Sequence, residues 1–494
     1  MRVRARPASR EWLDAAARVL LLARLEAAVR AARARGEEAL AAVTVPAPGV
    51  DPTAVVCASR LPGESWFCFE QPDRDGSALA ALGCVRAIEF PRGPASGGHV
   101  ATSGTPSGPE RFDAAARAWR RLAARAVAGA PGGPPGTRLV AVGGFAFAPQ
   151  GAGAPQWAGF APASLHVPQV ALARRGADVR LTVAALAAPD DLPEQLLAAA
   201  LARVEALREA PLPLLDPAPA GRCRVVSAMP PEHYEGAVAR AVERIRAGAF
   251  QKIVLAREVT VQAPTPHDAA AVFGVLRAGF ESCYVFCAGR GDAAFVAASP
   301  ELLIRRDGLR AQTVALAGST RRSADPAVDD HLGEQLLRSE KDRHEQEIVT
   351  RRIARALRPH AVWVAAPDEP ALIKVANIQH LGTPIRAQLT QPLSAVELAG
   401  LLHPTPAVGG EPHAAAAPVI PALEGLDRGW YAGAVGWTDA NDDGEFCVAL
   451  RCALLRGAEA RLYAGVGVVR DSDPAAELAE TEIKLGALLP VLAG

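Results

Sequence analysis

The sequence predicts an α+β fold built on a large antiparallel sheet, and three observations lead to this prediction. Short apolar runs rich in β-branched and aromatic residues recur along the chain and end at Gly, Pro or Asp, as strands do. Amphipathic stretches with helical periodicity lie between some of these runs, at irregular intervals. No βαβ unit repeats, so neither a doubly wound parallel sheet nor a barrel is expected.

Residues 1–220 are predicted to form a scaffold half that carries no catalytic chemistry. A proline-rich segment at 211–221 ends this half and is the best candidate for a linker. The elements expected before it are a helix over 11–36, strands over 42–45, 66–69, 139–142 and 165–170, and a helix over 189–209.

Polar side chains become dense over residues 221–494, which are predicted to carry the function. The segment 439–444 resembles the start of a calcium-binding loop, but Leu450 stands where a glutamate is required, so a hairpin turn is expected. The other expected elements are a helix over 231–247, strands over 253–260, 283–288, 294–298, 302–306 and 312–316, a long helix over 330–357 capped by Asp329 or Asp330, and a last helix that begins at Pro474 with Asp473 as its cap.

Composition narrows the class of function. Lys plus Arg and Asp plus Glu both number 53, and the resulting zero net charge argues against a nucleic-acid partner or a polybasic membrane binder. The eight cysteines include no C-x-x-C pair and are expected to be buried free thiols. The sequence shows no apolar leader segment and no run of about 18 apolar residues. We therefore expect a soluble cytoplasmic protein, and a monomer because no obvious pairing segment is present.

Two charged helices each carry a pair of carboxylates on one face. Asp342 and Glu345 stand three residues apart, and Glu477 and Glu480 repeat this spacing, with Lys484 following. Charge runs of this kind usually form solvated faces. If both pairs face one cavity, their oxygens suit Mg²⁺, which binds one or two carboxylates together with waters and an anionic substrate.

Lys252 and Glu301 are candidates for proton transfer. Lys252 directly precedes an apolar strand, where a lysine most often guards a solvated edge. A buried lysine at this position would have a lowered pKa and could act as a general base. Glu301 stands among apolar neighbours, where a carboxyl group could stay protonated and act as an acid, or form a buried salt bridge.

Arg451 and Gly465 suggest a site for a carboxylate. The Arg451 guanidinium and close backbone approach at Gly465 would together bind such a group. The run 465–467 is not a dinucleotide fingerprint, because the third glycine and an immediately following helix are missing.

Taken in order along the chain, several motifs resemble those of the chorismate-utilising enzymes, and most closely those of the isochorismate synthases. The resemblance covers about residues 225–490 and implies the family fold, in which two large antiparallel sheets pack together with helices outside. It makes residues 221–494 the chorismate-binding catalytic region. The matching stretches are QKIVLAR (251–257), SPEL (299–302), LAGS (316–319), SEKDRHE (339–345), LHPTPA (402–407), GAVGW (433–437), LRC (450–452), AGVG (464–467) and ETEIK (480–484).

The resemblance also implies roles for individual residues. Lys252 would be the general base that activates water for attack at C2 of chorismate, and Glu301 the general acid that protonates the departing C4 hydroxyl. Arg451 and the Gly465 backbone would bind the enolpyruvyl carboxylate. The implied Mg²⁺ ligands at the ring carboxylate are Glu345 and Glu480, supported by Asp342 and Glu477. Further pocket positions of the family are Gly318, Ser319, His380, Tyr431 and Lys484.

The lysine at 252 favours water as the nucleophile, because the family members that add ammonia usually lack it. The expected activity is therefore that of a Mg²⁺-dependent isomerase that stops at isochorismate. Salicylate synthases, which go on to eliminate pyruvate, are the alternative, although the segment 403–408 is typical of isochorismate synthases. A non-catalytic binding subunit would lack an acid, a base or a metal ligand, and all three are present. Use of the product in menaquinone, siderophore or salicylate synthesis is left open. Gln346 replaces a common histidine and would alter the surroundings of the metal.

Overall fold

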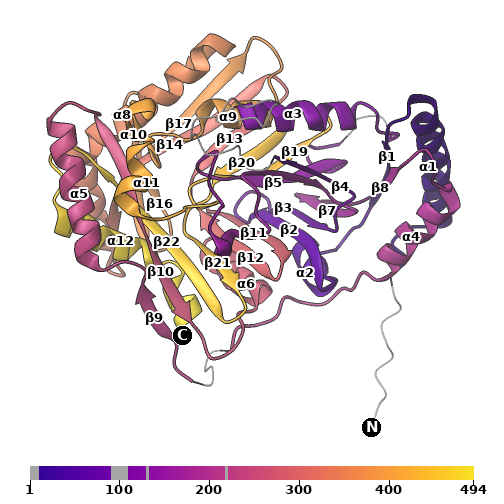
Figure 1. Ribbon diagram of the computed structural model, residues 1–494, viewed down its shortest axis with the longest axis horizontal. Helices are drawn as coiled ribbons and strands as arrows, with labels where there is room; N and C mark the ends of the chain where they lie inside the picture. Colours follow the sequence, from indigo (N-terminus) through magenta and orange to yellow (C-terminus); the bar gives the residue numbers. More distant parts are fainter. Residues whose placement is uncertain (1–9, 91–109, 130–132, 217–220) are drawn as a thin grey trace, which may run out of the picture.

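Two large antiparallel sheets form the centre of the molecule, with helices around them (Figure 1). The computed structural model describes residues 10–90, 110–129, 133–216 and 221–494. The expected α+β class is confirmed. Most of the segment predicted to be a linker, 211–216 and 221, has no helix or strand, and its residues 217–220 lie outside the described part.

The larger sheet has twelve strands within the described ranges, in the order β1-β8-β7-β3-β2-β11-β12-β21-β22-β10-β18, with β9 beside β10. Their bounds are β1 Ala39–Pro46, β2 Gly63–Gln71, β3 Ser77–Leu82, β7 Val170–Arg175, β8 Asp178–Ala187, β9 Arg224–Ser227, β10 Lys252–Gln262, β11 Tyr284–Gly291, β12 Ala293–Ser299, β18 Gly410–Glu411, β21 Cys452–Arg456 and β22 Glu459–Val468.

The smaller sheet has ten strands in the same described ranges, in the order β15-β17-β14-β13-β20-β19-β5-β6-β4, with β16 beside β17. Their bounds are β4 Arg86–Phe90, β5 Val140–Phe145, β6 Ala163–Val167, β13 Leu302–Asp307, β14 Arg310–Arg321, β15 Ala361–Ala365, β16 Ala371–Lys374, β17 Ile378–Leu389, β19 Ala434–Asp439 and β20 Gly444–Val448. Both sheets mix strands from the two halves of the chain: β2 pairs with β11, and β5 pairs with β19.

The helices lie at the two ends and on the outside of the sheets. Figure 1 shows α5 and α12 at one end of the molecule and α1 and α4 at the other. Their bounds are α1 Ala15–Arg35, α2 Pro52–Ala58, α3 Glu110–Ala123, α4 Pro193–Glu205, α5 Pro231–Arg246, α6 Ala269–Gly279, α7 Pro326–Arg338, α8 Glu340–Leu357, α9 Ala395–Leu402, α10 His413–Ala416, α11 Val419–Glu424, α12 Pro474–Leu485 and α13 Leu489–Ala493.

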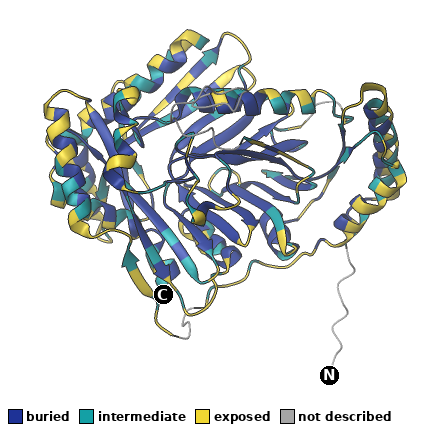
Figure 2. Ribbon diagram, viewed as in Figure 1, coloured by how far each residue is buried: buried dark blue, intermediate teal, exposed yellow. Residues whose placement is uncertain are grey.

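The larger sheet is buried on both faces, which strand β11 illustrates. Phe286 points into the core between the two sheets, where it packs near Phe295. Its neighbours Val285 and Cys287 point the other way, into a second core beneath α1, α2 and α6. Because successive side chains of a strand face opposite sides, a strand covered on both sides reads as a continuous apolar run. Figure 2 shows the sheets buried and the outer faces of the helices exposed.

The structure differs from the sequence prediction at the long helix over 330–357. Two helices, α7 and α8, take its place, and Ser339 separates them. Its hydroxyl accepts a hydrogen bond from the Asp342 amide and so caps α8, while Asp325 rather than Asp329 or Asp330 caps α7. The apolar run over 165–170 is likewise two strands, β6 and β7, on either side of Pro168.

Several smaller predictions are confirmed. The segment 439–444 joins β19 to β20 as a hairpin, and Asp473 caps α12. All eight cysteines are free thiols and six of them are buried, whereas Cys223 is half-buried and Cys84 is exposed. No helix in the described ranges is both long and apolar enough to cross a membrane.

Candidate active site

A cavity lies where β10 and β22 of the larger sheet face β14 of the smaller sheet, with α8 and α12 alongside. Three of the predicted site residues do not line this cavity: Lys252, Asp342 and Glu477. Each lies next to a residue that does, Lys252 beside Glu345, Asp342 beside Gly318 and Glu477 beside Glu480. The predicted residues that line the cavity are Glu301, Gly318, Ser319, Glu345, His380, Tyr431, Arg451, Gly465, Glu480 and Lys484.

Lys252 begins β10 and is completely buried. Its Nζ lies 2.8 Å from Glu345 Oε1, an ion pair that lacks the angles of a hydrogen bond. Gly467 on the neighbouring strand makes room for this pair, because a Cβ there would lie 2.2 Å from Glu345 Oε1 and 2.9 Å from Lys252 Cε. The interpretation of Lys252 as a solvated edge guard is therefore wrong.

Glu301 stands where the chain passes from one sheet to the other. β12 of the larger sheet ends at Ser299 and β13 of the smaller sheet begins at Leu302. The Val448 amide donates a 3.0 Å hydrogen bond to the Glu301 carbonyl and holds this crossover in place. Burial raises the pKa of the Glu301 carboxyl to about 8, although Lys252 and Arg451 oppose the shift. At neutral pH the carboxyl group is therefore mostly protonated.

Arg451 stands at a second crossover, between β20 and β21. Its backbone is left-handed, with φ of 48°, a conformation that is uncommon outside glycine and that turns the side chain into the cavity. Its Nη2 lies 3.2 Å from His380 Nε2, and His380 Nδ1 lies 3.2 Å from the Gly318 carbonyl. Burial, with Arg451 nearby, lowers the pKa of His380 to about 3. His380 is therefore neutral, with its proton on Nδ1 and Nε2 accepting from Arg451.

The opposite wall comes from β22, α12 and the segment before β19. Lys484 Nζ donates a 2.9 Å hydrogen bond to the Gly465 carbonyl and pairs with Glu480 at 2.8 Å. A Cβ at Gly465 would lie 2.7 Å from the Tyr431 hydroxyl, so only glycine fits there without a shift. Ser319 donates to Glu480 Oε1 at 2.6 Å. These contacts hold polar groups from four elements around one small space.

The four predicted metal ligands come from α8 and α12. Lys341 Nζ pairs with Glu477 at 2.6 Å, and Ser339 Oγ donates to Asp342. Burial raises the pKa of Asp342, and the neighbouring Glu345 carboxylate raises it further. Burial likewise raises the pKa of Glu477, with a smaller contribution from Glu480. Lys484 and Ser319 outweigh burial at Glu480 and lower its pKa. The carboxylates are thus close enough to repel one another.

This donor set fits Mg²⁺. No three metal-binding side chains of the described residues come close enough to hold one ion by themselves. Mg²⁺ needs fewer, because it keeps several waters and binds through one or two carboxylates and a substrate group. Glu345 and Glu480, which line the cavity, could provide those carboxylates. Gln346, beside Glu345, donates hydrogen bonds to the Ala315 carbonyl and to Thr383, and its influence on the surroundings of a metal stays a prediction.

Three residues that had no predicted role lie at the site in the structure. Lys341 neutralises Glu477, and Tyr463 lines the cavity and stacks on Tyr431, with ring centroids 5.3 Å apart. Thr405 is buried and lies beside Glu301, whose pKa it lowers against the larger effect of burial. Lys341 and Thr405 belong to the motifs at 339–345 and 402–407, and Tyr463 directly precedes the motif at 464–467, so the signal was their position in or beside those motifs.

The chain belongs to the family of chorismate binding enzymes, whose family model matches residues 26–493. It is therefore an enzyme. The salicylate biosynthesis isochorismate synthase of Pseudomonas aeruginosa is 38% identical over 476 residues, which cover 94% of this chain and 93% of the relative. Isochorismate synthase EntC of Escherichia coli is 40% identical over 259 residues, 52% of this chain and 66% of the relative.

Solved structures show the same fold. MenF, the menaquinone-specific isochorismate synthase from Escherichia coli, superposes with a TM-score of 0.74 at 26% identity, covering 96% of this chain and 99% of that one. The putative 2,3-dihydroxybenzoate-specific isochorismate synthase DhbC from Bacillus anthracis gives a TM-score of 0.67 at 28% identity, covering 88% of this chain and 98% of that one. The expected family fold is confirmed.

Proposed function

We propose that this chain converts chorismate to isochorismate, by attack of water at C2 and loss of the C4 hydroxyl, with Mg²⁺ bound. The observation that carries the proposal is that two groups suited to proton transfer occur together. Lys252 is a fully buried lysine, and burial raises the pKa of the Glu301 carboxyl to about 8. An amine base beside the cavity and a neutral carboxylic acid in its wall are the two groups that this exchange of hydroxyls requires.

The proton transfers follow from the two positions. Lys252 must first lose to solvent the proton that it holds in its ion pair with Glu345, and as a neutral amine it accepts a proton from the attacking water. Glu301 gives its proton to the departing C4 hydroxyl, which leaves as water. Lys252 begins β10, whereas Glu301 lies at the crossover between β12 and β13, so the two groups come from separate parts of the fold.

The substrate's negative charges are met by cations and by backbone groups. Arg451, oriented by neutral His380, would bind the enolpyruvyl carboxylate beside the Gly465 backbone. Glu345 and Glu480 would hold Mg²⁺, with Asp342 and Glu477 supporting them, and the ion would supply the positive charge that meets the ring carboxylate. Their four negative charges are balanced in part by Lys252, Lys341 and Lys484 when no ion is bound.

The experiment that tests this proposal incubates the purified protein with chorismate, with Mg²⁺ or with a chelator. The products are separated by chromatography, and pyruvate is assayed in the same samples. We expect isochorismate to approach an equilibrium mixture with chorismate, with little pyruvate, and turnover to stop after chelation and return with added Mg²⁺.

Two outcomes would contradict the proposal. Salicylate with a matching amount of pyruvate would make the chain a salicylate synthase. Turnover that survives complete chelation would remove the metal role from Glu345 and Glu480, while leaving the acid and base assignments to be tested by substitution.

A further inference from the structure

A second and larger cavity, of about 580 Å³, lies away from the candidate active site. It is formed by α1, β1 and β8, the residues just after α3, residues 133–139 and the turn after β19. Figure 1 shows α1, β1 and β8 at the end of the molecule opposite α5 and α12. None of its lining residues belongs to the site proposed above.

Three arginines from three separate elements line this cavity: Arg24 from α1, Arg138 from the segment before β5, and Arg180 from β8. Arg180 pairs with Asp178 at 2.9 Å. Arg24 donates to the Ala42 carbonyl at 2.6 Å. Within the described ranges, Arg138 makes one long hydrogen bond, of 3.4 Å to the Gly129 carbonyl, and its buried Nε has no hydrogen-bond partner there. Arg138 thus has unused hydrogen-bonding capacity.

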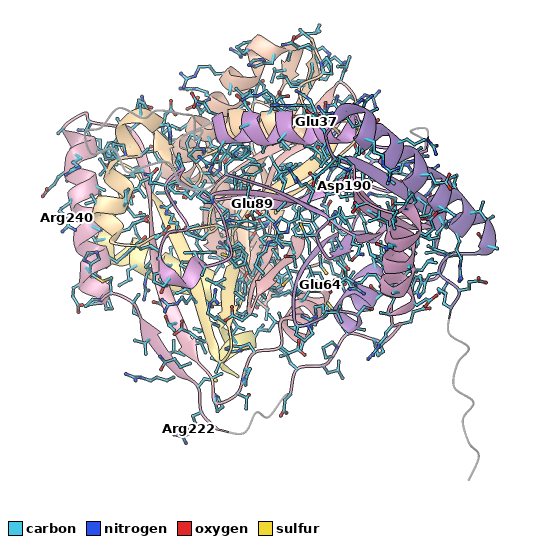
Figure 3. The ribbon with its side chains drawn as sticks, turned by 45° about the vertical axis from the view of Figure 1, so that its right-hand side comes forward. Glu37, Glu64, Glu89, Asp190, Arg222 and Arg240 are labelled. Carbon is cyan, nitrogen blue, oxygen red and sulfur yellow. The ribbon has the colours of Figure 1, made fainter. Side chains whose placement is uncertain are left out.

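The positive charges are balanced only in part, because Asp178 pairs with Arg180 but no carboxylate of the described residues pairs with Arg24 or Arg138. Asp439 is the only acidic residue among the described residues that line the cavity. Its carboxylate accepts hydrogen bonds from the Gly136 and Asn441 amides. Glu37, labelled in Figure 3, pairs with Arg125. Burial lowers the pKa of Arg24, and the neighbouring Arg138 lowers it further. Burial also lowers the pKa of Arg138, and the neighbouring Arg180 adds to this shift. The whole chain has zero net charge, so this surplus is a local feature.

Glycines allow the guanidinium groups to approach the backbone. A Cβ at Gly129 would lie 2.9 Å from Arg24 Nη2, and a Cβ at Gly133 would lie 3.2 Å from Arg180 Nη1. Gly133 also has φ of 100°, which side chains other than glycine rarely adopt. The guanidinium groups of Arg24 and Arg180 are therefore seated against the backbone of this wall.

We propose that this cavity binds a small anion that carries two or more negatively charged oxygen groups. A guanidinium forks around the two oxygens of a carboxylate or a phosphate. Arg24 and Arg138, which pair with no carboxylate of the described residues, can each hold one such group. The Thr44 hydroxyl, also in the lining, lies 2.9 Å from the Thr182 hydroxyl and can donate to the anion when Thr182 donates to it. Leu139 and Ala126 provide an apolar wall for a carbon skeleton.

Isothermal titration calorimetry and thermal unfolding of the full chain test the proposal, with citrate and pyrophosphate as probes in about 0.15 M NaCl. We expect saturable binding of at least one probe and a rise in Tm that grows with its concentration, because a ligand of the folded state stabilises it by mass action. Arg138→Gln and Arg24→Gln should each weaken binding at least tenfold. Binding of citrate alone would identify carboxylates as the ligand groups, and binding of pyrophosphate alone would identify phosphates.

The matched control is Arg30→Gln, which removes an exposed arginine of the same helix α1 and should leave the affinity unchanged. If Arg138 had only a structural role, Arg138→Gln would lower the Tm of the ligand-free protein. We expect the Tm of the ligand-free variant to equal or exceed that of the wild type, because the substitution relieves repulsion between like charges. No saturable binding of either probe at concentrations on the order of 10 mM would overturn the proposal. Equal affinity in wild type, Arg138→Gln and Arg24→Gln would do so as well.

Discussion

Glu301, the proposed acid, makes the stability of the folded state depend on pH. Its burial raises the carboxyl pKa from 4.5 to about 8, so the folded protein holds a proton that the unfolded chain releases above pH 4.5. The folded state therefore binds more protons than the unfolded state between these two values. Stability linked to this group is fully present below pH 4.5 and is lost as pH rises toward 8, with a slope of up to about 1.4 kcal/mol per pH unit.

We predict that Glu301→Gln removes this pH dependence. The free energies of unfolding of the variant and the wild type are measured with urea. Their difference should shift in favour of the variant by a few kcal/mol as the pH rises from 5 to 8. Turnover should fall at least a hundredfold, because the amide cannot give up a proton. A stability difference that is the same at both pH values would show that Glu301 is already ionised in the folded protein.

We predict that Lys252→Met lowers kcat by a factor of about 100 to 10,000, which is the usual contribution of a positioned base. Circular dichroism should show a folded protein, although the buried Glu345 carboxylate loses its partner and Tm falls. Lys374→Met is the matched control, because Lys374 pairs with Asp329 and Asp330 away from the cavity. Turnover of the Lys252→Met variant near that of the control would exclude Lys252 as the base.

At the same scale, the common location of several residues could be predicted from the sequence while their partners could not. The resemblance to the family implied that Glu301, Arg451 and Glu480 share one pocket, and all three line the cavity. It gave no indication that Lys341 would neutralise Glu477, because that pair joins two helices far apart in the chain. Likewise, the neutral state of His380 depends on burial beside Arg451, which only the folded chain determines.

Strand β22 shows how an element, rather than one side chain, shapes the site. Gly467 lets Glu345 and Lys252 approach the strand closely, as Gly465 does for Tyr431. We predict that Gly467→Ala lowers kcat/KM at least a hundredfold, because the added methyl group displaces the ion pair. Gly279→Ala, at the end of α6 where a Cβ meets no atom within 4 Å, is the control and should leave turnover unchanged. Steady-state kinetics of both variants checks this, and equal values would show that the cavity adapts.

The break between α7 and α8 is a second feature at this scale. The sequence predicted one continuous helix, because no glycine or proline interrupts the pattern from Glu334 through Ser339 to Leu357. The structure places Ser339 at a cap whose hydroxyl contacts Asp342, so the break fixes the first turn of α8, where Asp342 and Glu345 stand. A serine inside a charged run can be identified as a helix N-cap only when the direction of the following helix is known.

At the scale of the whole molecule, the two sheets join the halves of the chain. Strand β2 pairs with β11, and β5 pairs with β19, so each half supplies strand edges that the other half completes. We predict that a fragment of residues 1–220 does not fold cooperatively by itself. Near-ultraviolet circular dichroism and urea unfolding of the fragment should show neither fixed aromatic packing nor a sharp transition. A sharp transition with a native-like spectrum would mean that the N-terminal half is an independent domain.

The fold class was accessible to sequence reasoning because strand patterns are local, whereas the strand order was not. Val142 and Trp437 are partners across β5 and β19, and nothing near either residue indicates the other. The resemblance to a family supplied the packing of two sheets, but not the order of their strands.

The long separation between paired strands also affects how the chain is made. During synthesis Cys68 leaves the ribosome long before Cys287, its partner across β2 and β11, and Val142 long before Trp437. Unpaired apolar strands of a nascent chain are prone to aggregate until their partners arrive. We therefore expect the yield of this protein in cells to depend on the supply of chaperones during translation more than on the stability of the finished core.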